Sequence, residues 1–286
     1  MKNAIAEYLE LTENEKSDLW KTATFVFDTN VLLNLYRYTT RTRDSLLLAL
    51  EELADRVWMP HHVAEEFMKD RYKVISDSSA VYKLLSNNIN KFVEQCCIIL
   101  NLNKEKDGEI LELSEYMHQW VGKIEKQNPK IQDCINDEIL ERLLIVYNGK
   151  VGKGFDDVKI SEIEKEGRER YEKRIPPGYK DYKKQRDGSE NVYGDLIIWK
   201  EILQYAKEEK RDIIYITNDK KEDWWNEVGG KTIGPRIELR KEFYKFASNQ
   251  RFHMYRMEAF LSMHIDSKGE KIDNAIIEDI SFVSYC

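Results

Sequence analysis

The sequence predicts an α/β fold in which a central parallel sheet is flanked by helices. Two short runs, 25–27 and 213–216, are rich in β-branched and aromatic residues, which favours an extended chain. The second run is almost continuously apolar, as is typical of a parallel strand that is covered on both faces. Elsewhere apolar residues recur at three- and four-residue spacing, which indicates amphipathic helices.

The composition is that of a folded protein with a substantial core. Of 286 residues, 42% are hydrophobic and 11% aromatic. No apolar run approaches the roughly 18 residues of a membrane helix, and the acidic start is unlike a signal peptide, so we expect a cytoplasmic protein with no membrane partner. The four cysteines have no CxxC spacing, which argues against a disulfide framework or a zinc site. The net charge of -7 argues against general binding to polyanions, although a carboxylate cluster for divalent cations also contributes negative charge.

The first predicted strand ends in a carboxylate. Asp28 follows the run 25–27, and Thr29 and Asn30 then open a helix-compatible apolar stretch. Ligands collect outside the carboxyl ends of parallel strands, which is where Asp28 is expected. The alternative is that Asp28 only caps the helix.

The next 135 or so residues are predicted to be mainly helical. Residues 1–21 form an amphipathic lead-in, 46–53 a second helical stripe, and 56–59 a short strand stopped by Pro60. A helix from His61 to about Tyr72 carries the pair Glu65-Glu66, of which Glu66 borders the apolar face and Glu65 points to solvent. The alternative is that both acids are solvated. Stripes from Val74 to about Ile163 indicate helix packing without a function of their own.

The second half repeats the acidic strand end. Asp195 stands in the first turn of a helix whose buried face continues through Ile198 and Trp199, although a first-turn acid also complements the helix dipole. The strand 213–216 ends in Thr217-Asn218-Asp219. If it lies parallel to the first strand, Asp28 and Asp219 open at the same edge of the sheet.

A basic and aromatic stretch occupies residues 168–186. Its composition suits a phosphate backbone with stacked bases, with a solvated loop as the alternative. The residues that we expect to contact nucleic acid are Arg174, Tyr179, Lys180, Lys183 and Lys184.

The combined acids point to metal-dependent chemistry. Asp28, Glu66, Asp195 and Asp219 brought together repel one another unless cations neutralise them. Hard oxygen ligands without His or Cys select Mg²⁺ or Mn²⁺, which activate water and stabilise a leaving oxygen. The implied reaction is phosphodiester hydrolysis.

The sequence resembles the PIN-domain proteins, in particular their larger PIN-like branch with a long helical insertion. The resemblance rests on six segments in order across residues 24–243: FVFDTNVLLNLY, MPHHVAEEF, RIPPGYKD, YGDLIIWKEIL, IIYITNDKKEDWW and GPRIELRKEF. It implies a fold like that of FLAP-type nucleases and a Mg- or Mn-dependent nuclease, most often acting on RNA. It implies metal-ligand roles for Asp28, Glu66, Asp195 and Asp219, with Asn30 and Thr217 in support. Asp223 is either a further ligand or a loop residue.

In the expected mechanism, Asp28, Asp195 and Asp219 hold one ion, and Glu66 positions a second ion or the attacking water. An endoribonuclease is favoured over a deoxyribonuclease, and a toxin or an antiviral defence effector is the biological role considered. A non-catalytic RNA- or partner-binding module is the main alternative. An aspartyl phosphotransferase is a weaker one, because Asn30 stands where haloacid-dehalogenase enzymes have a second Asp.

The expected organisation is a nuclease domain over residues 1–243, with a helical insertion at about 74–190. Residues 244–286 form a C-terminal extension that includes a strand-like segment at Ile276–Val283. The extension is either a homodimer or partner surface, or an element docked on the domain.

Overall fold

The computed structural model describes residues 8–102, 107–131, 134–182, 192–247 and 250–284. Its central sheet contains β1 (Thr24–Phe27), β2 (Ile213–Ile216) and β5 (Phe252–Tyr255) in the order β1-β2-β5. Both strand pairs are parallel, with Phe27 opposite Ile216 and Ile216 opposite Tyr255. The predicted parallel sheet is therefore confirmed, and the segment after residue 243 supplies its third strand.

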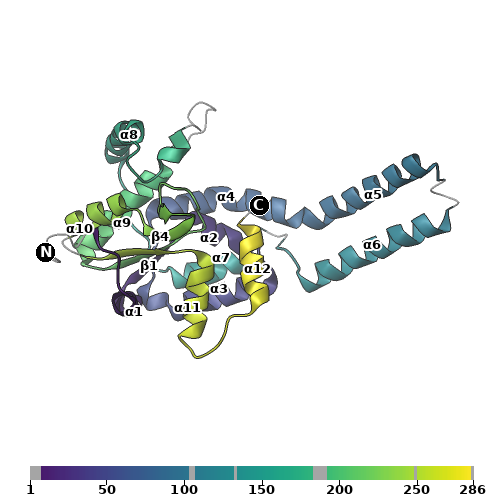
Figure 1. The fold of residues 1–286 in the computed structure, drawn as a ribbon, viewed down its shortest axis with the longest axis horizontal. Coiled ribbons are helices and arrows are strands. Elements are labelled where there is room, and N and C mark those ends of the chain that lie inside the picture. Colours follow the sequence, from purple (N-terminus) through teal and green to yellow (C-terminus); the bar gives the residue numbers. More distant parts are fainter. Residues whose placement is uncertain (1–7, 103–106, 132–133, 183–191, 248–249, 285–286) are drawn as a thin grey trace.

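Helices cover both faces of this sheet (Figure 1). On one face Phe252 packs on Trp199 of α9 (Gly194–Glu209) and on Phe243 of α10 (Ile237–Phe246). On the other face Phe25 and Phe27 pack on Phe260 of α11 (Met257–Asp266). Alternation along the strands explains the division, because neighbouring residues point to opposite faces. The side chains of all three strands are thus buried, apart from Tyr255, which is partly buried.

The remaining elements surround this core. They are α1 (Glu13–Thr22), α2 (Thr29–Leu33), η3 (Asn34–Tyr36), α3 (Thr40–Glu52), η4 (Ala54–Arg56), α4 (His61–Ser79), α5 (Val81–Leu100), α6 (Gly108–Gln127), α7 (Glu138–Val146), α8 (Asp157–Glu172), the hairpin β3 (Trp225–Val228) and β4 (Lys231–Pro235), and α12 (Asn274–Val283). Among the described residues, no helix is both long enough and apolar enough to cross a membrane.

The helical insertion consists of two kinds of helix. The pair α5 and α6 runs side by side and projects from the body of the protein (Figure 1). In contrast, α7 packs into the main core through Ile139, Leu143 and Val146. The helix α4 carries the chain from the sheet out to α5.

Two local predictions were wrong, and a third holds only in part. The strand-like segment 276–283 is the helix α12, because Asp273 caps its first turn and Ile276 and Ile280 bury one helical face. Residues 56–59 form only isolated bridges, Val57 to Phe25 and Met59 to Val151, after a 3₁₀ turn. Within the described residues the helical lead-in begins at Glu13, because Thr12 and Glu15 form a capping box, and residues 1–7 of this prediction lie outside the described residues.

Candidate functional site

The two strand-end acids lie at one edge of the sheet. The parallel register puts Asp28 beside Thr217, and the backbone N–H of Asp28 donates to the carbonyl of Ile216 at 2.9 Å. The hydroxyl of Thr217 donates to Oδ2 of Asp28 at 2.6 Å and accepts from the backbone N–H of Asp219 at 2.9 Å. One buried hydroxyl therefore connects the two acidic turns.

Asn30 completes this connection. Its amide nitrogen donates to Oδ2 of Asp28, and its amide oxygen accepts from the backbone N–H of Asn218 at 3.0 Å. It lies in α2, one turn beyond the strand. The local sequence DTN thus fixes the carboxylate of the first strand to the backbone of the second.

Asp195 enters from the helix layer. It lies in the first turn of α9, where the indole N–H of Trp224 donates to its Oδ2 at 3.4 Å. The charges of Asp28 and Asp219 act on it, so the three acids from three separate elements share one region. That these acids share one metal ion stays a prediction.

A lysine and a fourth aspartate belong to the same cluster. The ammonium group of Lys221 lies 2.8 Å from Asp219, 2.9 Å from Asp181 and 3.8 Å from Asp195. Asp181 is 8% exposed, and it follows Pro177, Gly178 and Lys180 in the RIPPGYKD segment. Sequence reasoning did not single out either Asp181 or Lys221, although both lie in segments that support the family resemblance.

Burial and mutual repulsion perturb these groups. Burial, opposed by the Thr217 hydrogen bond and assisted by the charges of Asp219 and Glu66, raises the pKa of Asp28 to about 6. Burial also raises the pKa of Asp195 well above its ordinary value, although Lys221 opposes this. Burial lowers the pKa of Lys221, but Asp195 and Asp219 outweigh burial and raise it above its usual range. The site therefore holds more negative charge than its surroundings neutralise.

Glu66 approaches from α4. Its Oε2 accepts from the hydroxyl of Thr29 at 2.6 Å, and its Oε1 lies 3.5 Å from Nε2 of His62. The side chain of Glu66 is 21% exposed and that of Glu65 is 60% exposed, as the helical spacing predicted. His62 is a further residue that sequence reasoning missed; its position four residues before Glu66 was the available signal.

Asp223 holds the basic segment against the strand end. It is fully buried, and its Oδ2 accepts from the backbone N–H of Lys180 at 3.0 Å. The side chain of Lys180 lies 2.7 Å from Glu222, and the hydroxyl of Tyr179 donates to the same carboxylate at 3.4 Å. The hydrogen bond from the backbone of Lys180 therefore gives Asp223 a structural contact in the loop.

The contact of the other basic residues with nucleic acid stays a prediction. Arg174 lies just after α8 with a left-handed backbone, whereas Lys183 and Lys184 fall outside the described residues. Arg170, in the same basic stretch, is 8% exposed and pairs with Glu242 of α10 at 2.7 Å. It fastens α8 to the body, so it is not available to a polyanion.

The donor set suits a hard divalent cation in its chemistry. It consists of carboxylates with hydroxyl and amide support, which is the ligand type that Mg²⁺ and Mn²⁺ prefer. Within the described parts of the chain, however, no three His, Cys, Asp or Glu side chains are close enough together to hold a metal ion. The ammonium group of Lys221 lies within 4 Å of Asp181, Asp195 and Asp219 and neutralises part of their charge.

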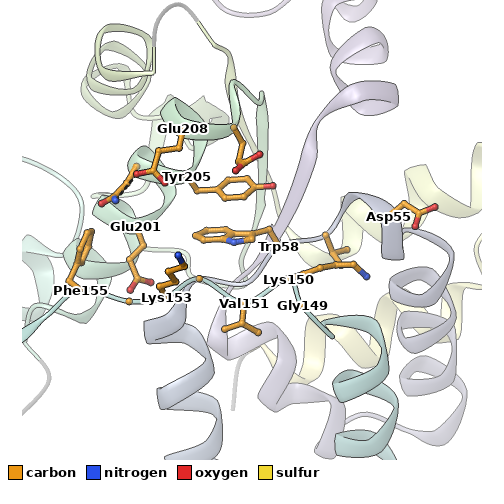
Figure 2. Close-up of a pocket in the computed structure, with 15 residues that line it drawn as sticks. Asp55, Trp58, Gly149, Lys150, Val151, Lys153, Phe155, Glu201, Tyr205 and Glu208 are labelled. Atoms are coloured by element: carbon orange, nitrogen blue, oxygen red, sulfur yellow. Dashed lines mark hydrogen bonds between the residues drawn. The ribbon is translucent and has the colours of Figure 1, made fainter.

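A separate cavity of about 550 Å³ lies near the other end of α9 (Figure 2). There the rings of Trp58 and Tyr205 stack with centroids 4.1 Å apart. Tyr205 follows Asp195 by ten residues, which is about 15 Å along a helix. The cavity is lined by Asp55, Glu201 and Glu208 but by none of the strand-end acids, so it is not part of the cluster described above.

One family model matches most of the chain. A family model described as a PIN-like domain matches residues 24–239, a span that contains Asp28, Glu66, Asp195 and Asp219. No curated protein and no solved structure matches the chain. The matched span covers more than half of the sequence and includes β1, β2 and the helices that carry the acids. The chain therefore belongs to the PIN-like domain family, a nuclease-type family.

Proposed function

We propose that this protein is a Mg²⁺- or Mn²⁺-dependent nuclease that hydrolyses phosphodiester bonds, with RNA as its favoured substrate. The observation that carries the proposal is the convergence of Asp28, Asp195 and Asp219 from three elements into one region where burial and repulsion raise the pKa of Asp28 and of Asp195. Repulsion among these carboxylates disfavours folding unless cations neutralise it. Divalent cations are the ones that the carboxylate, hydroxyl and amide oxygens of this site fit.

The residues have distinct roles in this proposal. Asp28, Asp195 and Asp219 would hold one ion, and Glu66 would orient the attacking water or contribute to a second ion. Bound Mg²⁺ or Mn²⁺ supplies Lewis acidity that activates water and neutralises charge on the phosphate. Thr217 and Asn30 keep the Asp28 carboxylate oriented through the hydrogen bonds described above.

The substrate path is proposed to run past Tyr179 and Lys180. These residues lie beside the cluster because Asp223 binds the backbone of Lys180. A tyrosine ring and an ammonium group suit a base and a phosphate respectively. Arg174, Lys183 and Lys184 extend the same basic segment in the sequence.

The test is cleavage of labelled single-stranded RNA and DNA of mixed sequence with Mn²⁺, Mg²⁺ or EDTA. Native protein is compared with Asp28→Asn and with Asp55→Asn, a matched control because Asp55 is exposed and lies at the separate cavity. We expect metal-dependent cutting by native protein and by Asp55→Asn, and a loss of at least about 100-fold in Asp28→Asn. Cutting that survives in Asp28→Asn or in EDTA would reject the proposed site.

The second candidate is a non-catalytic RNA- or partner-binding module. This candidate is favoured because, in the part of the chain that the structure describes, no three metal-binding side chains surround one point, and Lys221 lies among the acids instead. Binding of RNA with equal affinity by native protein and Asp28→Asn, without cleavage of either polymer, would support this candidate. A phosphotransferase is disfavoured because Asn30 uses its amide to bind Asp28.

The biological role that we propose for the nuclease is that of a cytoplasmic toxin or antiviral defence effector. Such a role requires cleavage of cellular or viral RNA. Induced expression of the native protein should then arrest growth or protect against phage infection, and Asp28→Asn should do neither. Equal effects of the two proteins would reject a role that depends on catalysis.

A further inference from the structure

The helical hairpin of α5 and α6 is antiparallel and fixed by two hydrogen bonds. The hydroxyl of Tyr82 donates to the carbonyl of Asn128 at 2.7 Å near its base. Farther out, Nε2 of His118 lies 3.0 Å from Oδ1 of Asn90. Moving along α5 from Tyr82 to Asn90, the bonded partner moves backwards in the sequence from Asn128 to His118, as an antiparallel pair requires.

The hairpin has a small core of its own. Among the described residues, only four of its side chains are buried in a cluster separate from the main core, namely Ile89, Val93, Ile110 and Val121. Large apolar side chains nevertheless remain exposed along both helices, including Phe92 (49%), Ile99 (76%), Tyr116 (69%) and Trp120 (49%). Two packed helices bury only one stripe each, so a second apolar stripe needs another partner.

Six of the exposed apolar residues, three in each helix, lie on one side of their helix, whereas Ile98, Leu100 and Leu111 do not. With 3.6 residues per turn, Val81, Phe92 and Ile99 lie about 60 to 80° to one side of the buried Ile89. By the same measure Leu113, Trp120 and Tyr116 lie about 40 to 100° to one side of the inward Met117. In both helices the rotation has the same sense.

The bond between Asn90 and His118 shows that these two sides share one face of the hairpin. Asn90 is the residue after Ile89, and His118 is the residue after Met117, so each is rotated by about 100° from the inward direction of its helix. This rotation is opposite in sense to that of the exposed apolar residues. Since Asn90 and His118 meet, those sides of α5 and α6 form one face. The sides that carry Phe92 and Trp120 must then form the other face, which is apolar.

The charges of α6 indicate what covers this face. Glu109 and Glu112 lie toward the tip of the hairpin, and Lys123 and Lys126 lie toward its base; all four are exposed. Glu112 precedes Met117 by five residues, and Lys123 follows His118 by five. A twofold axis between Met117 and His118 sets Glu112 opposite Lys123 of a second antiparallel α6, and both residues lie on the side of α6 that carries Trp120.

We propose that the apolar face of the α5–α6 hairpin binds the same face of a second copy of this chain, with the two α6 helices antiparallel. The result is a four-helix bundle with one nuclease domain at each end. Tyr116 and Trp120 flank the twofold axis and form the centre of the contact, where aromatic residues contribute most. The acidic and basic ends of α6 fix the antiparallel arrangement.

The first test is the mass of the full chain in solution, measured by sedimentation equilibrium over a range of micromolar concentrations. We expect a dimer for native protein and a dissociation constant raised by at least about 10-fold in Phe92→Glu and in Trp120→Glu. Leu111→Glu is the matched control, because Leu111 is 39% exposed but lies on the Asn90–His118 face. Circular dichroism verifies that each variant keeps its helices.

Two outcomes of this test would overturn the proposal. One is a native protein that stays monomeric throughout, which would leave the face for a different partner or for none. The other is a dimer whose dissociation constant is the same in Phe92→Glu, in Trp120→Glu and in the control Leu111→Glu.

Charge reversal tests the antiparallel arrangement independently. Glu112→Lys and Lys123→Glu should each weaken the dimer, because each sets like charges opposite one another twice. An equimolar mixture of the two variants should recover native affinity, since every facing pair is then opposite in sign. A mixture no stronger than either variant alone would reject the antiparallel pairing of α6.

Discussion

Lys221 lies 2.8 Å from the carboxylate of Asp219, two residues earlier in the chain. The same ammonium group reaches Asp181 from the basic segment and Asp195 from α9. A single cation therefore compensates acids from three parts of the fold. In the proposed nuclease, Lys221 and a divalent ion both neutralise these carboxylates, so the loss of one should increase the effect of the other on stability.

Replacing Lys221 by Met should make the protein depend more strongly on metal for its stability. Without the ammonium group the carboxylates repel one another, and since Lys221 is about one-third exposed we expect a loss of only about 1 to 2 kcal/mol in EDTA. Mn²⁺ should then raise the melting temperature more in Lys221→Met than in native protein. Lys231→Met, at an exposed position in β4, serves as the control. An equal response to Mn²⁺ in native protein and Lys221→Met would contradict this account.

Asp28→Asn should stabilise the metal-free protein while it removes activity. Burial raises the pKa of Asp28 from 3.8 to about 6 in the folded state. The free energy of unfolding is therefore highest below about pH 4, decreases as the pH rises from 4 to 6, and is lowest above pH 6, where Asp28 is ionised in the folded protein. At pH 8 the gain from Asn should be about 1 to 3 kcal/mol, since two pKa units correspond to about 2.7 kcal/mol. The measurement is urea unfolding in EDTA at pH 8 and pH 5. A variant less stable than native at pH 8 would show that the Asp28 charge is not the costly feature.

The buried pair Arg71–Asp137 should be essential for anchoring α4 to α7. Asp137 is 1% exposed, accepts from Arg71 and from the hydroxyl of Tyr36, and caps the first turn of α7. Asp137→Asn leaves a buried guanidinium without its counter-charge and should cost about 3 to 5 kcal/mol. Glu162→Gln breaks an exposed pair with Lys159 and should leave the free energy of unfolding almost unchanged, because solvent screens this pair. Urea unfolding measures both, and similar costs in the two variants would contradict the role of burial.

His253 should make the protein less stable in mild acid. Burial, with the charges of Lys16 and Arg240, lowers the pKa of His253 from 6.5 to about 4 in the folded state. Its folded form therefore resists protonation, so stability is retained above pH 6.5 and is lost as the pH falls from 6.5 toward 4. Between pH 8 and pH 5 this amounts to about 2 kcal/mol. The difference in unfolding free energy between native protein and His253→Gln should shift by that amount, and a pH-independent difference would contradict the assignment.

Local sequence determined the elements that carry the acids. The apolar runs before Asp28 and Asp219 specify buried parallel strands, because β-branched and aromatic side chains fit a sheet covered on both faces. The period of α9 likewise put Asp195 at the end of a buried stripe. These predictions succeeded because each depends on a few neighbouring residues.

Segments without a distinct local period were predicted less well. The run 276–283 reads equally as a strand or a helix, and its packing on α3 and α11 decides for the helix. The strand β5 was not identified as part of the sheet, since the strand with which it pairs is β2, almost forty residues earlier. The pairing of residues far apart in the chain is invisible to a local pattern.

By itself, then, the sequence determined the family, the parallel strands and the acids at their ends. Only the tertiary structure decided that Lys221 and Asp181 lie among those acids. It also decided that Asp223 binds the backbone of Lys180 and that Arg170 forms an ion pair with Glu242. The physical reason is that charge compensation depends on distance in space. A carboxylate selects its partner from whatever the fold brings within a few ångströms, and sequence spacing does not record that neighbourhood.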